Sequence, residues 1–191
     1  MSAFVFKNRG ALLALPAVLL VIFGKPNAAG IELGLPVALA GELLRIWAVG
    51  YSGVTTRNDA VVAPELVTAG PYAYVRNPLY IGNFITAAGF AIAFTGANPA
   101  ATRTALIAVA LGTMIAVYAT IIPHEENFLR TRFGDSFVRY CKDVARIIPQ
   151  FKLASAPNGT WKSAVIAQAE SRTFLFFGAM LILLAVKAFL V

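Results

Sequence analysis

Long apolar runs separated by short polar breaks dominate the pattern along the chain. A helix needs about 20 predominantly apolar residues to cross a bilayer, because each residue adds only about 1.5 Å along the axis. Five runs suit such helices, at about residues 10–23, 30–51, 78–96, 101–122 and 172–191. The breaks GKPNAAG and TGANPA carry the Gly, Pro and Asn residues typical of turns. The pattern therefore predicts an all-α fold, a polytopic membrane helix bundle with about five transmembrane helices and amphipathic helices on its cytoplasmic side.

The first apolar run follows basic residues, as the apolar part of a secretory signal peptide does. No convincing small-residue cleavage site precedes Lys25 and Pro26, so we expect a first span that is retained. This run is short and contains Pro16, which makes it the least regular of the five.

Composition agrees with a membrane protein. Of the 191 residues, 59% are hydrophobic and 13% are charged, whereas soluble domains are about half apolar and about a quarter charged. Because the loops between runs are short, we expect residues 1–191 to form a single domain. The chain has one cysteine, Cys141, which excludes an internal disulfide, and it has no metal-type Cys/His cluster, so we expect no metal site.

The sixteen Lys and Arg residues predict the orientation. The formal net charge of +7 would suit nucleic-acid binding, but beside the apolar runs it fits the cytoplasmic face of a membrane better. With a cytoplasmic N-terminus, twelve basic residues fall on that side: Lys7, Arg9, Arg57, Arg76, Arg130, Arg132, Arg139, Lys142, Arg146, Lys152, Lys162 and Arg172. Lys25, Arg103 and Lys187 fall outside, and Arg45 lies within a span. We therefore expect a bacterial-type inner membrane protein with its N-terminus cytoplasmic and its C-terminus outside.

The stretch GPYAYVRNPLYIG at residues 70–82 is polar and rigid for the entry to an apolar run. Pro78 suits the first turn of a helix, where its missing N–H would have no partner anyway. The free N–H groups of a helix start favour anions. The rings of Tyr72, Tyr74 and Tyr80 can stack on a base or hold a cation. The alternative is an interfacial belt of Tyr and Arg beside a helix-starting proline, which composition alone favours.

A second polar stretch, PHEENFLRTRFGDSFVRYCKDVARIIP at residues 123–149, follows the fourth run. Because the third and fourth spans form a hairpin, this stretch and the one before the third span emerge on the same face of the membrane. It begins with two adjacent carboxylates, Glu125 and Glu126. Their simplest explanation is charge balance with Arg130 and Arg132, which is worth under about 1 kcal/mol per exposed pair.

The rest of this stretch predicts a short amphipathic helix. Gly134 suits a helix stop and Asp135 the start of the next helix. The apolar side chains that follow fall on one stripe, at Phe137, Val138, Cys141, Val144 and Ala145. We expect this helix to lie on the membrane through that stripe. His124 is a lone histidine, which is more often an interfacial spectator than a catalyst.

Two charged residues lie inside the second apolar run. Glu42 and Arg45 are three residues apart and share a helix face. Ionisable groups at this depth usually face the protein interior and pair. The two residues form either a self-neutralising pair or the polar wall of a cavity open to the cytoplasm, and the sequence leaves both open.

The two polar stretches together resemble a known family. GPYAYVRNPLYIG is similar to the G-x-Y-x-x-x-R-H-P-x-Y-x-G signature of the membrane methyltransferases that include isoprenylcysteine carboxyl methyltransferase and phospholipid methyltransferases. The second stretch resembles the tail of the same family at Glu125, Glu126, Leu129, Phe133, Gly134, Phe137, Tyr140, Val144, Arg146, Ile148 and Pro149. Both motifs occur in the right order with one helical hairpin between them, and the match covers about residues 57–150.

The resemblance implies a transferase that binds S-adenosyl-L-methionine between these two segments and methylates a hydrophobic, lipid-embedded acceptor. By position, the cofactor contacts of the family fall on Pro64, Glu65, Leu66, Val67, Tyr72, Asn77, Pro78, Leu79, Tyr80, Glu125 and Glu126. The motifs imply no catalytic residue. A methyl transfer needs no metal, but it needs the acceptor held in line with the methyl group.

Three departures from the family pattern bear on the cofactor and the acceptor. Asn77 stands in place of the usual histidine, and Phe137 in place of the first tyrosine of the tail. Ile121 and Ile122 occupy the region where the isoprenylcysteine branch carries an arginine for the substrate carboxylate. An aminolipid headgroup such as phosphatidylethanolamine is therefore weakly favoured over an isoprenylcysteine-type carboxylate. The run at 172–191 follows the shared tail, and we expect packing or oligomer contacts from it.

Two other classes of function compete with the enzyme. A non-catalytic membrane scaffold or interaction protein would retain the fold, but Arg76, Tyr80 and both glutamates persist together. A small transporter fits less well, because the chain has no obvious inverted repeat and no paired broken helices at the midplane.

Overall fold

The computed structural model of the chain describes residues 2–53, 63–149 and 157–190, and the secondary structure in these ranges is helical. The helices in chain order are α1 (Ser2–Phe23), α2 (Ala28–Ser52), the 3-10 helix η2 (Gly70–Ala73), α3 (Pro78–Thr95), α4 (Ala100–Phe133), α5 (Asp135–Asp143), the 3-10 helix η3 (Ser163–Val165) and α6 (Ile166–Leu190). Arg57 and Lys152, which counted toward the predicted orientation, lie outside the described residues, as do both ends of the region 57–150.

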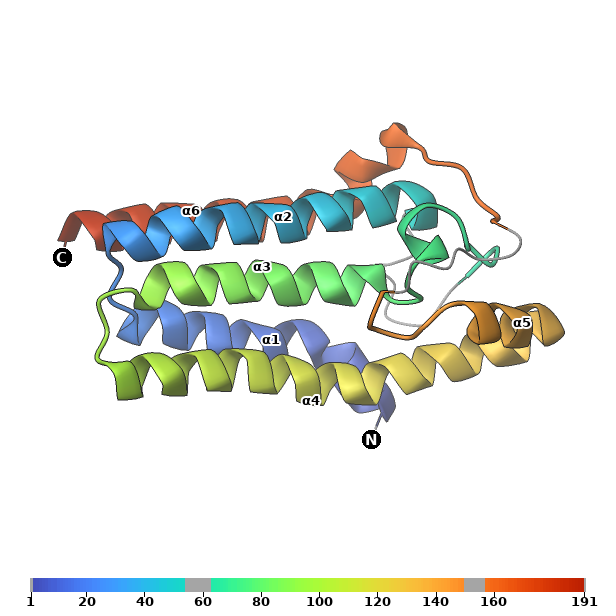
Figure 1. Cartoon of the computed structure of the whole chain (residues 1–191), viewed down its shortest axis with the longest axis horizontal. Helices are drawn as coiled ribbons and strands as arrows, with labels where there is room; N and C mark the ends of the chain where they lie inside the picture. Colours follow the sequence, from blue (N-terminus) through green and yellow to red (C-terminus); the bar gives the residue numbers. More distant parts are fainter. Residues whose placement is uncertain (1, 54–62, 150–156, 191) are drawn as a thin grey trace.

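Helices α1, α2, α3, α4 and α6 run side by side as a bundle, and α5 with the segment 63–77 lies at one end of it (Figure 1). Four helices are long and apolar enough to cross a membrane: α2, α3, α4 and the continuous stretch Ser163–Leu190. The apolar part of α1 covers only Asn8–Phe23. The predicted polytopic helical membrane protein is confirmed, and the first of its five expected spans is too short to count as a full crossing.

Two helices extend beyond their predicted bounds, and both extensions lie toward the polar end of the bundle. α4 continues past Ile122 into the second polar stretch, and α6 begins at Ile166 instead of near Arg172. Hydropathy marks where an apolar run ends, but buried contacts can continue a helix beyond that point. Glu126 and Glu170 on the added turns are buried and paired with arginines, so each extension has one side that faces the protein interior.

Small residues let α2 and α3 pack closely along their length. Gly34 and Gly41 on α2 face Gly89 and Gly82 on α3, and a Cβ atom on Gly89 would meet the backbone of Ala38. Close approach of two backbones is the usual role of small residues between membrane helices. This seam fixes the position of the start of α3 relative to the end of α2.

Apolar side chains fill the bundle in two clusters. One cluster comprises Leu20, Ala38, Phe90, Ala91, Ala93, Phe94, Ala110, Met180 and Leu184. The other comprises Phe6, Met114, Val117, Tyr118, Ile121 and Ile122. Since both clusters include residues of α1, this helix is an integral part of the bundle.

Helix α6 is fixed to the bundle near both of its ends. Near its start, the fully buried Glu170 accepts hydrogen bonds from Arg45 Nη2 at 2.8 Å through each carboxylate oxygen. Near its end, Lys187 Nζ donates to the carbonyls of Val21 at 2.5 Å and Ile22 at 3.0 Å. These carbonyls end α1, where the helix dipole favours a cation. The last helix therefore makes polar contacts with α2 and α1, in addition to the packing contacts expected for it.

Candidate functional site

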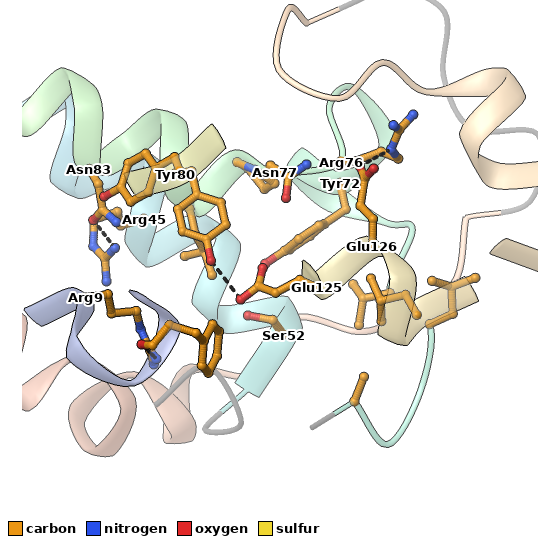
Figure 2. A pocket seen from close by; sticks show the side chains of 18 of the residues that line it. Arg9, Arg45, Ser52, Tyr72, Arg76, Asn77, Tyr80, Asn83, Glu125 and Glu126 are labelled. Atoms are coloured by element: carbon orange, nitrogen blue, oxygen red, sulfur yellow. Dashed lines mark hydrogen bonds and ion pairs between the residues drawn. The ribbon is translucent and has the colours of Figure 1, made fainter. Parts of the chain in front are cut away.

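A cavity of about 390 Å³ lies at the polar end of the bundle, and this volume is within the range of small-molecule sites. Its walls come from α1, α2, α3, α4, α5, α6 and the segment 63–77 (Figure 2). All eleven residues that the motifs single out line it: Pro64, Glu65, Leu66, Val67, Tyr72, Asn77, Pro78, Leu79, Tyr80, Glu125 and Glu126. The fold thus brings the two polar stretches together at one cavity.

The segment before α3 is held in shape by a second, distant segment. Gly70 adopts a φ of 61°, a conformation that other residues rarely reach, and it begins the 3-10 helix η2. Thr68 and Ala69 donate their N–H groups to the carbonyl of Asn158 at 2.9 and 3.0 Å. The Asn158 side chain in turn donates to the carbonyl of Leu66 at 2.9 Å. The chain that follows α5 therefore supports this wall of the cavity.

Helix α3 begins at Pro78, as the sequence predicts. Asn77 precedes it, but its side chain does not cap the helix and instead donates to the carbonyl of Arg146 at 3.0 Å. The first turn of a helix leaves N–H groups without intrahelical partners. Since Leu79 and Tyr80 belong to that turn and line the cavity, their N–H groups lie where an anionic part of a ligand is favoured.

The two adjacent glutamates of α4 have different partners. Glu125 accepts a hydrogen bond of 2.7 Å from the Tyr80 hydroxyl. Burial raises the pKa of Glu125, and the hydrogen bond from Tyr80 and the charge of Arg9 on α1 oppose that shift in part. The Tyr80 ring also packs on the ring of Tyr118, with 4.5 Å between centroids. Glu125 is therefore held by α3 while it lines the cavity (Figure 2).

Glu126 lies between two arginines. Arg76 Nε donates to one carboxylate oxygen at 2.9 Å, and Arg146 donates to the other at 2.6 and 3.0 Å. Arg76 also donates to the carbonyl of Val144 at 2.5 Å. The partners of Glu126 thus come from both motifs and are not the neighbouring Arg130 and Arg132 of the charge-balance explanation. This cluster ties the entry of α3 to α4 and to the end of the second stretch.

Two further tyrosines, the half-buried Tyr72 and the buried Tyr140, complete this side of the cavity. Burial raises the pKa of Tyr72, and a hydrogen bond with Ser52 opposes that shift in part. Burial also raises the pKa of Tyr140, whose hydroxyl donates to the carbonyl of Tyr72 at 2.7 Å. Both phenols therefore stay neutral at physiological pH and remain able to donate hydrogen bonds.

Helix α5 turns its apolar stripe toward the protein. Gly134 separates it from α4 with a φ of 51°, and α5 starts at Asp135, both as predicted. Phe137 is only 1% exposed, and it packs with Tyr140 and Val144 against Ala73. The expectation that the stripe faces the membrane is wrong, because the wall of the cavity covers it.

Cys141 lies on the same stripe. It packs at the edge of the cluster formed by Ala73, Phe137, Tyr140 and Val144, as its predicted packing role requires. Burial raises the pKa of its thiol, so it stays in the unreactive, protonated form near neutral pH.

The charges inside α2 fit both interpretations that the sequence left open. Arg45 lies 3.7 Å from Glu42, but its closer partners are Glu170, at 2.8 Å, and Asn83. Arg45 also lines the cavity, although it is 7% exposed. Glu170 was missed by the sequence reasoning, because the predicted last span started after it.

Several further residues line the cavity without having been singled out as contacts. They are Phe6, Arg9, Gly10, Leu13, Arg45, Ser52, Ala63, Arg76, Asn83, Tyr118, Leu129, Phe137, Tyr140 and Thr173. Asn83 and Tyr118 could have been found, because polar residues inside apolar runs usually face the protein interior. Nothing local marks Arg9 or Thr173, which reach the site only through helix packing.

Comparison with known proteins identifies relatives over the centre of the chain. The sequence model of the family Phospholipid methyltransferase matches residues 30–136. Protein-S-isoprenylcysteine O-methyltransferase B of Arabidopsis thaliana is 30% identical over 121 residues, which are 61% of this chain and 57% of that protein. No solved structure matches the chain.

Two bacterial relatives carry names of a different kind. The nickel-cobalt-cadmium resistance protein NccN of Alcaligenes xylosoxydans xylosoxydans is 30% identical over 63% of this chain and 49% of its own length. The cobalt-zinc-cadmium resistance protein CzcN of Cupriavidus metallidurans is 29% identical over 68% of this chain and 51% of its own length. This chain therefore spans about half the length of the curated relatives it matches. Within the described ranges, no three His, Cys, Asp or Glu side chains are grouped to hold a metal ion.

Proposed function

This chain belongs to the phospholipid methyltransferase family, and from that premise we propose that it is an integral membrane methyltransferase that uses S-adenosylmethionine. Its acceptor is a hydrophobic, lipid-embedded molecule, and residues 1–191 act as one domain. One observation carries the proposal: both family motifs, far apart in sequence, line the same cavity at the end of a membrane bundle. That cavity is the cofactor site.

The groups in the cavity suit S-adenosylmethionine, which has a carboxylate, an ammonium, a sulfonium and an adenosine. The first turn of α3, with Leu79 and Tyr80, favours the carboxylate. Glu125 can accept from the ammonium or the ribose, because an ionised carboxylate has several acceptor positions. The rings of Tyr72 and Tyr80 can pack on the adenine or the sulfonium. Glu126 acts through its two arginines, which keep the walls of the site in place.

The residues of the chain position the reactants and exclude water. When bound, S-adenosylmethionine supplies the methyl group: its carbon–sulfur bond breaks, the electron pair stays on sulfur, and a lone pair of the acceptor forms the new bond to carbon. A buried site with fixed partners favours the in-line arrangement that this transfer needs. A neutral amine would attack without a strong base and would lose a proton to water afterwards.

The acceptor is an aminolipid headgroup in preference to an isoprenylcysteine-type carboxylate. Ile121 and Ile122 are buried in an apolar cluster, so they offer no cation to a carboxylate. Arg45 lines the site, but its guanidinium already binds Glu170 and Asn83. The isoprenylcysteine acceptor stays the alternative, because a relative carries that name.

We place the cofactor site at the cytoplasmic face of a bacterial-type inner membrane. The described basic residues Arg76, Arg130, Arg139 and Arg146 gather at the cavity end of the bundle, and basic residues favour the cytoplasmic side. α6 ends at the opposite end (Figure 1), which supports a C-terminus outside. A lipid acceptor would then enter sideways from the bilayer, between helices.

Isothermal titration calorimetry tests the cofactor assignment. Detergent-purified protein titrated with S-adenosylmethionine and with its demethylated product should show saturable binding of both. Folded protein without binding would exclude the enzyme and leave a membrane scaffold or interaction protein that retains the methyltransferase fold. Incubation with methyl-labelled cofactor and separate lipid classes then identifies the acceptor. Label found only on a prenylcysteine analogue would overturn the aminolipid assignment.

A further inference from the structure

A second cavity, of about 310 Å³, lies deeper in the bundle. Most of its lining is apolar and comes from α1, α3, α4 and α6. These apolar residues include Ala17 and Leu20 of α1, Phe90 of α3, Ala110 of α4, and Phe177 and Met180 of α6. Its polar lining residues are few, and most lie where it meets the first cavity. An apolar space with a few polar groups at one end suits a molecule that has an apolar chain and a polar head.

The two cavities meet at a shared set of residues. Gly10, Leu13, Arg45, Asn83, Tyr118 and Thr173 line both of them. A ligand whose apolar chain lies in the second cavity can therefore present its polar head at the wall of the first. This adjacency to the proposed methyl donor site distinguishes the second cavity from an isolated packing gap.

The apolar walls of the second cavity come largely from helices outside the family match. The match covers residues 30–136, whereas α1 contributes Ala14, Ala17 and Leu20 and α6 contributes Phe177 and Met180. α6 is held at one end of the cavity by the Arg45–Glu170 pair, and farther along its own Lys187 donates to a carbonyl of α1. It is therefore a fixed wall, and its side chains can limit the size of an occupant.

We propose that the second cavity binds the apolar chain of the methyl acceptor, and that α1 and α6 set the length of chain it takes. The inference rests on the proposed function, because it assigns the acceptor of the same site. The reacting head of the acceptor lies at the junction, beside Asn83 and Tyr118. Specificity for the chain then resides in this protein's own helices, whereas most residues of the donor site lie in the region that the family model matches.

The junction favours an uncharged head with a lone pair. Asn83 uses its oxygen to accept from Arg45 Nη1, which leaves its NH₂ group as a donor. The Tyr118 hydroxyl lies beside Asn83 and can both donate and accept. Arg45 Nη2 is bound to Glu170 and Thr173. Neutral hydrogen-bonding groups of this kind suit an amine, and a carboxylate would have no free guanidinium to bind.

A chain-length series of straight-chain primary alcohols, whose head is uncharged and carries a lone pair, tests the assignment by binding, without the cofactor. Ala17→Phe fills the second cavity from α1, and Val18→Phe is its matched control, since Val18 is 50% exposed and lines neither cavity. For the native protein and the control, affinity should rise about fourfold per added methylene until the cavity is full. For Ala17→Phe the rise should stop several methylenes earlier. The same dependence of affinity on chain length in the two variants would overturn the proposal. Partition of the ligand into the detergent is the same for both variants, so it does not affect their comparison.

A second pair keeps the test decisive if Ala17→Phe does not fold. Phe177→Ala enlarges the cavity from α6, and Phe174→Ala is the control, as Phe174 lines neither cavity. Phe177→Ala should move the limit to longer chains and Phe174→Ala should leave it unchanged; a limit that does not move counts against the proposal. A straight-chain primary alcohol with a terminal diazirine should label Leu20 or Met180 on irradiation. Label confined to lipid-facing residues such as Leu175 would contradict it.

Cofactor calorimetry on the same samples separates the two proposals. Ala17 and Phe177 lie outside the first cavity, so their variants should bind S-adenosylmethionine as the native protein does. If the native protein binds the alcohols with a length limit but no cofactor, the proposed function fails and the chain site stands. Cofactor binding with no length limit gives the opposite result.

Discussion

Two buried charge clusters hold the site, and they are built with opposite composition. Glu126 lies between two arginines, Arg76 and Arg146. Arg45 lies between two glutamates, Glu42 and Glu170. The first cluster is partly open to water, because the Arg146 side chain is 52% exposed, whereas the Arg45 and Glu170 side chains are 9% and 0% exposed.

The two clusters have different roles, because they differ in exposure to water and in the segments that they join. The first cluster joins segments of both family motifs at the donor site, and its cost of burial is low because water reaches one partner. The second cluster fixes α6, a helix outside the family match. Its closest pair, Arg45 and Glu170, is desolvated on both sides. Removing one member of a desolvated pair leaves an uncompensated buried charge, which is more costly than losing an exposed pair. We therefore expect the second cluster to govern stability and the first to govern cofactor binding.

The largest effect is expected from Arg45→Ala. It leaves Glu170 without its guanidinium partner and should destabilise the fold by about 3–5 kcal/mol. Thermal unfolding in detergent measures the loss, and Arg172→Ala, an exposed arginine on α6, is the control. Glu170→Ala should cost a similar amount, and the double variant should cost much less than the sum. Additive losses would show that the two side chains do not act as a pair.

Glu126→Gln should weaken cofactor binding more than it weakens the fold. It removes the charge that holds Arg76 and Arg146, and hydrogen bonds to charged groups are worth about 1.5–3 kcal/mol. We expect a dissociation constant for S-adenosylmethionine about tenfold higher by calorimetry, with a modest change in melting temperature. Glu32→Gln, an exposed glutamate outside the cavity, is the control. Unchanged affinity for the Glu126 variant would mean that the donor site lies elsewhere.

Two variants of Tyr80 separate the contribution of its ring to cofactor binding from the contribution of its hydroxyl. Tyr80→Ala removes both, and it should weaken cofactor binding without unfolding the bundle. Tyr80→Phe removes only the hydrogen bond to Glu125, and we expect a loss of about threefold to tenfold, in line with about 1 kcal/mol for one hydrogen bond. Tyr74→Phe is the control, since Tyr74 does not line the cavity. Equal losses for both Tyr80 variants would assign the whole effect to the hydroxyl.

The smallest effect is expected where the chain departs from the family signature. Asn77→His restores the usual residue, and its ring can still donate to the carbonyl of Arg146, which Asn77 binds now. Cofactor affinity should then stay within about threefold, because one neutral hydrogen bond replaces another. A larger change by calorimetry, in either direction, would mean that this side chain contacts the cofactor itself.

Much of the fold could be predicted because the membrane imposes it. Apolar runs of sufficient length become helices, since no other element satisfies its backbone hydrogen bonds alone in lipid, and α2, α3 and α4 start within two residues of their predicted bounds. The errors fall where protein contacts replace lipid as the reason for helicity. The last turns of α4 and the first turns of α6 are polar in sequence. They are helical because Glu126 pairs with Arg76 and Glu170 pairs with Arg45.

The candidate site was predictable to the extent that it lies in the two motifs. All eleven residues singled out from the motifs line the cavity, but the motifs gave no sign of Arg9 or Thr173. The stripe of α5 shows why pattern alone was insufficient. An amphipathic stripe is the same in sequence whether lipid or protein covers it, and only the position of Ala73 beside Phe137 decides the matter.

By itself, the sequence determined that the chain is a helical membrane protein, where its helices lie and which two stretches carry the family motifs. These features depend on local hydropathy and on residue order, and neither property requires knowledge of tertiary contacts. The tertiary structure alone decided that Glu126 binds Arg76 and Arg146, that α6 is held by Arg45, and that two cavities meet at Asn83 and Tyr118. Each of these depends on the packing of helices distant in sequence, and packing is set by side-chain shape and burial across the whole bundle.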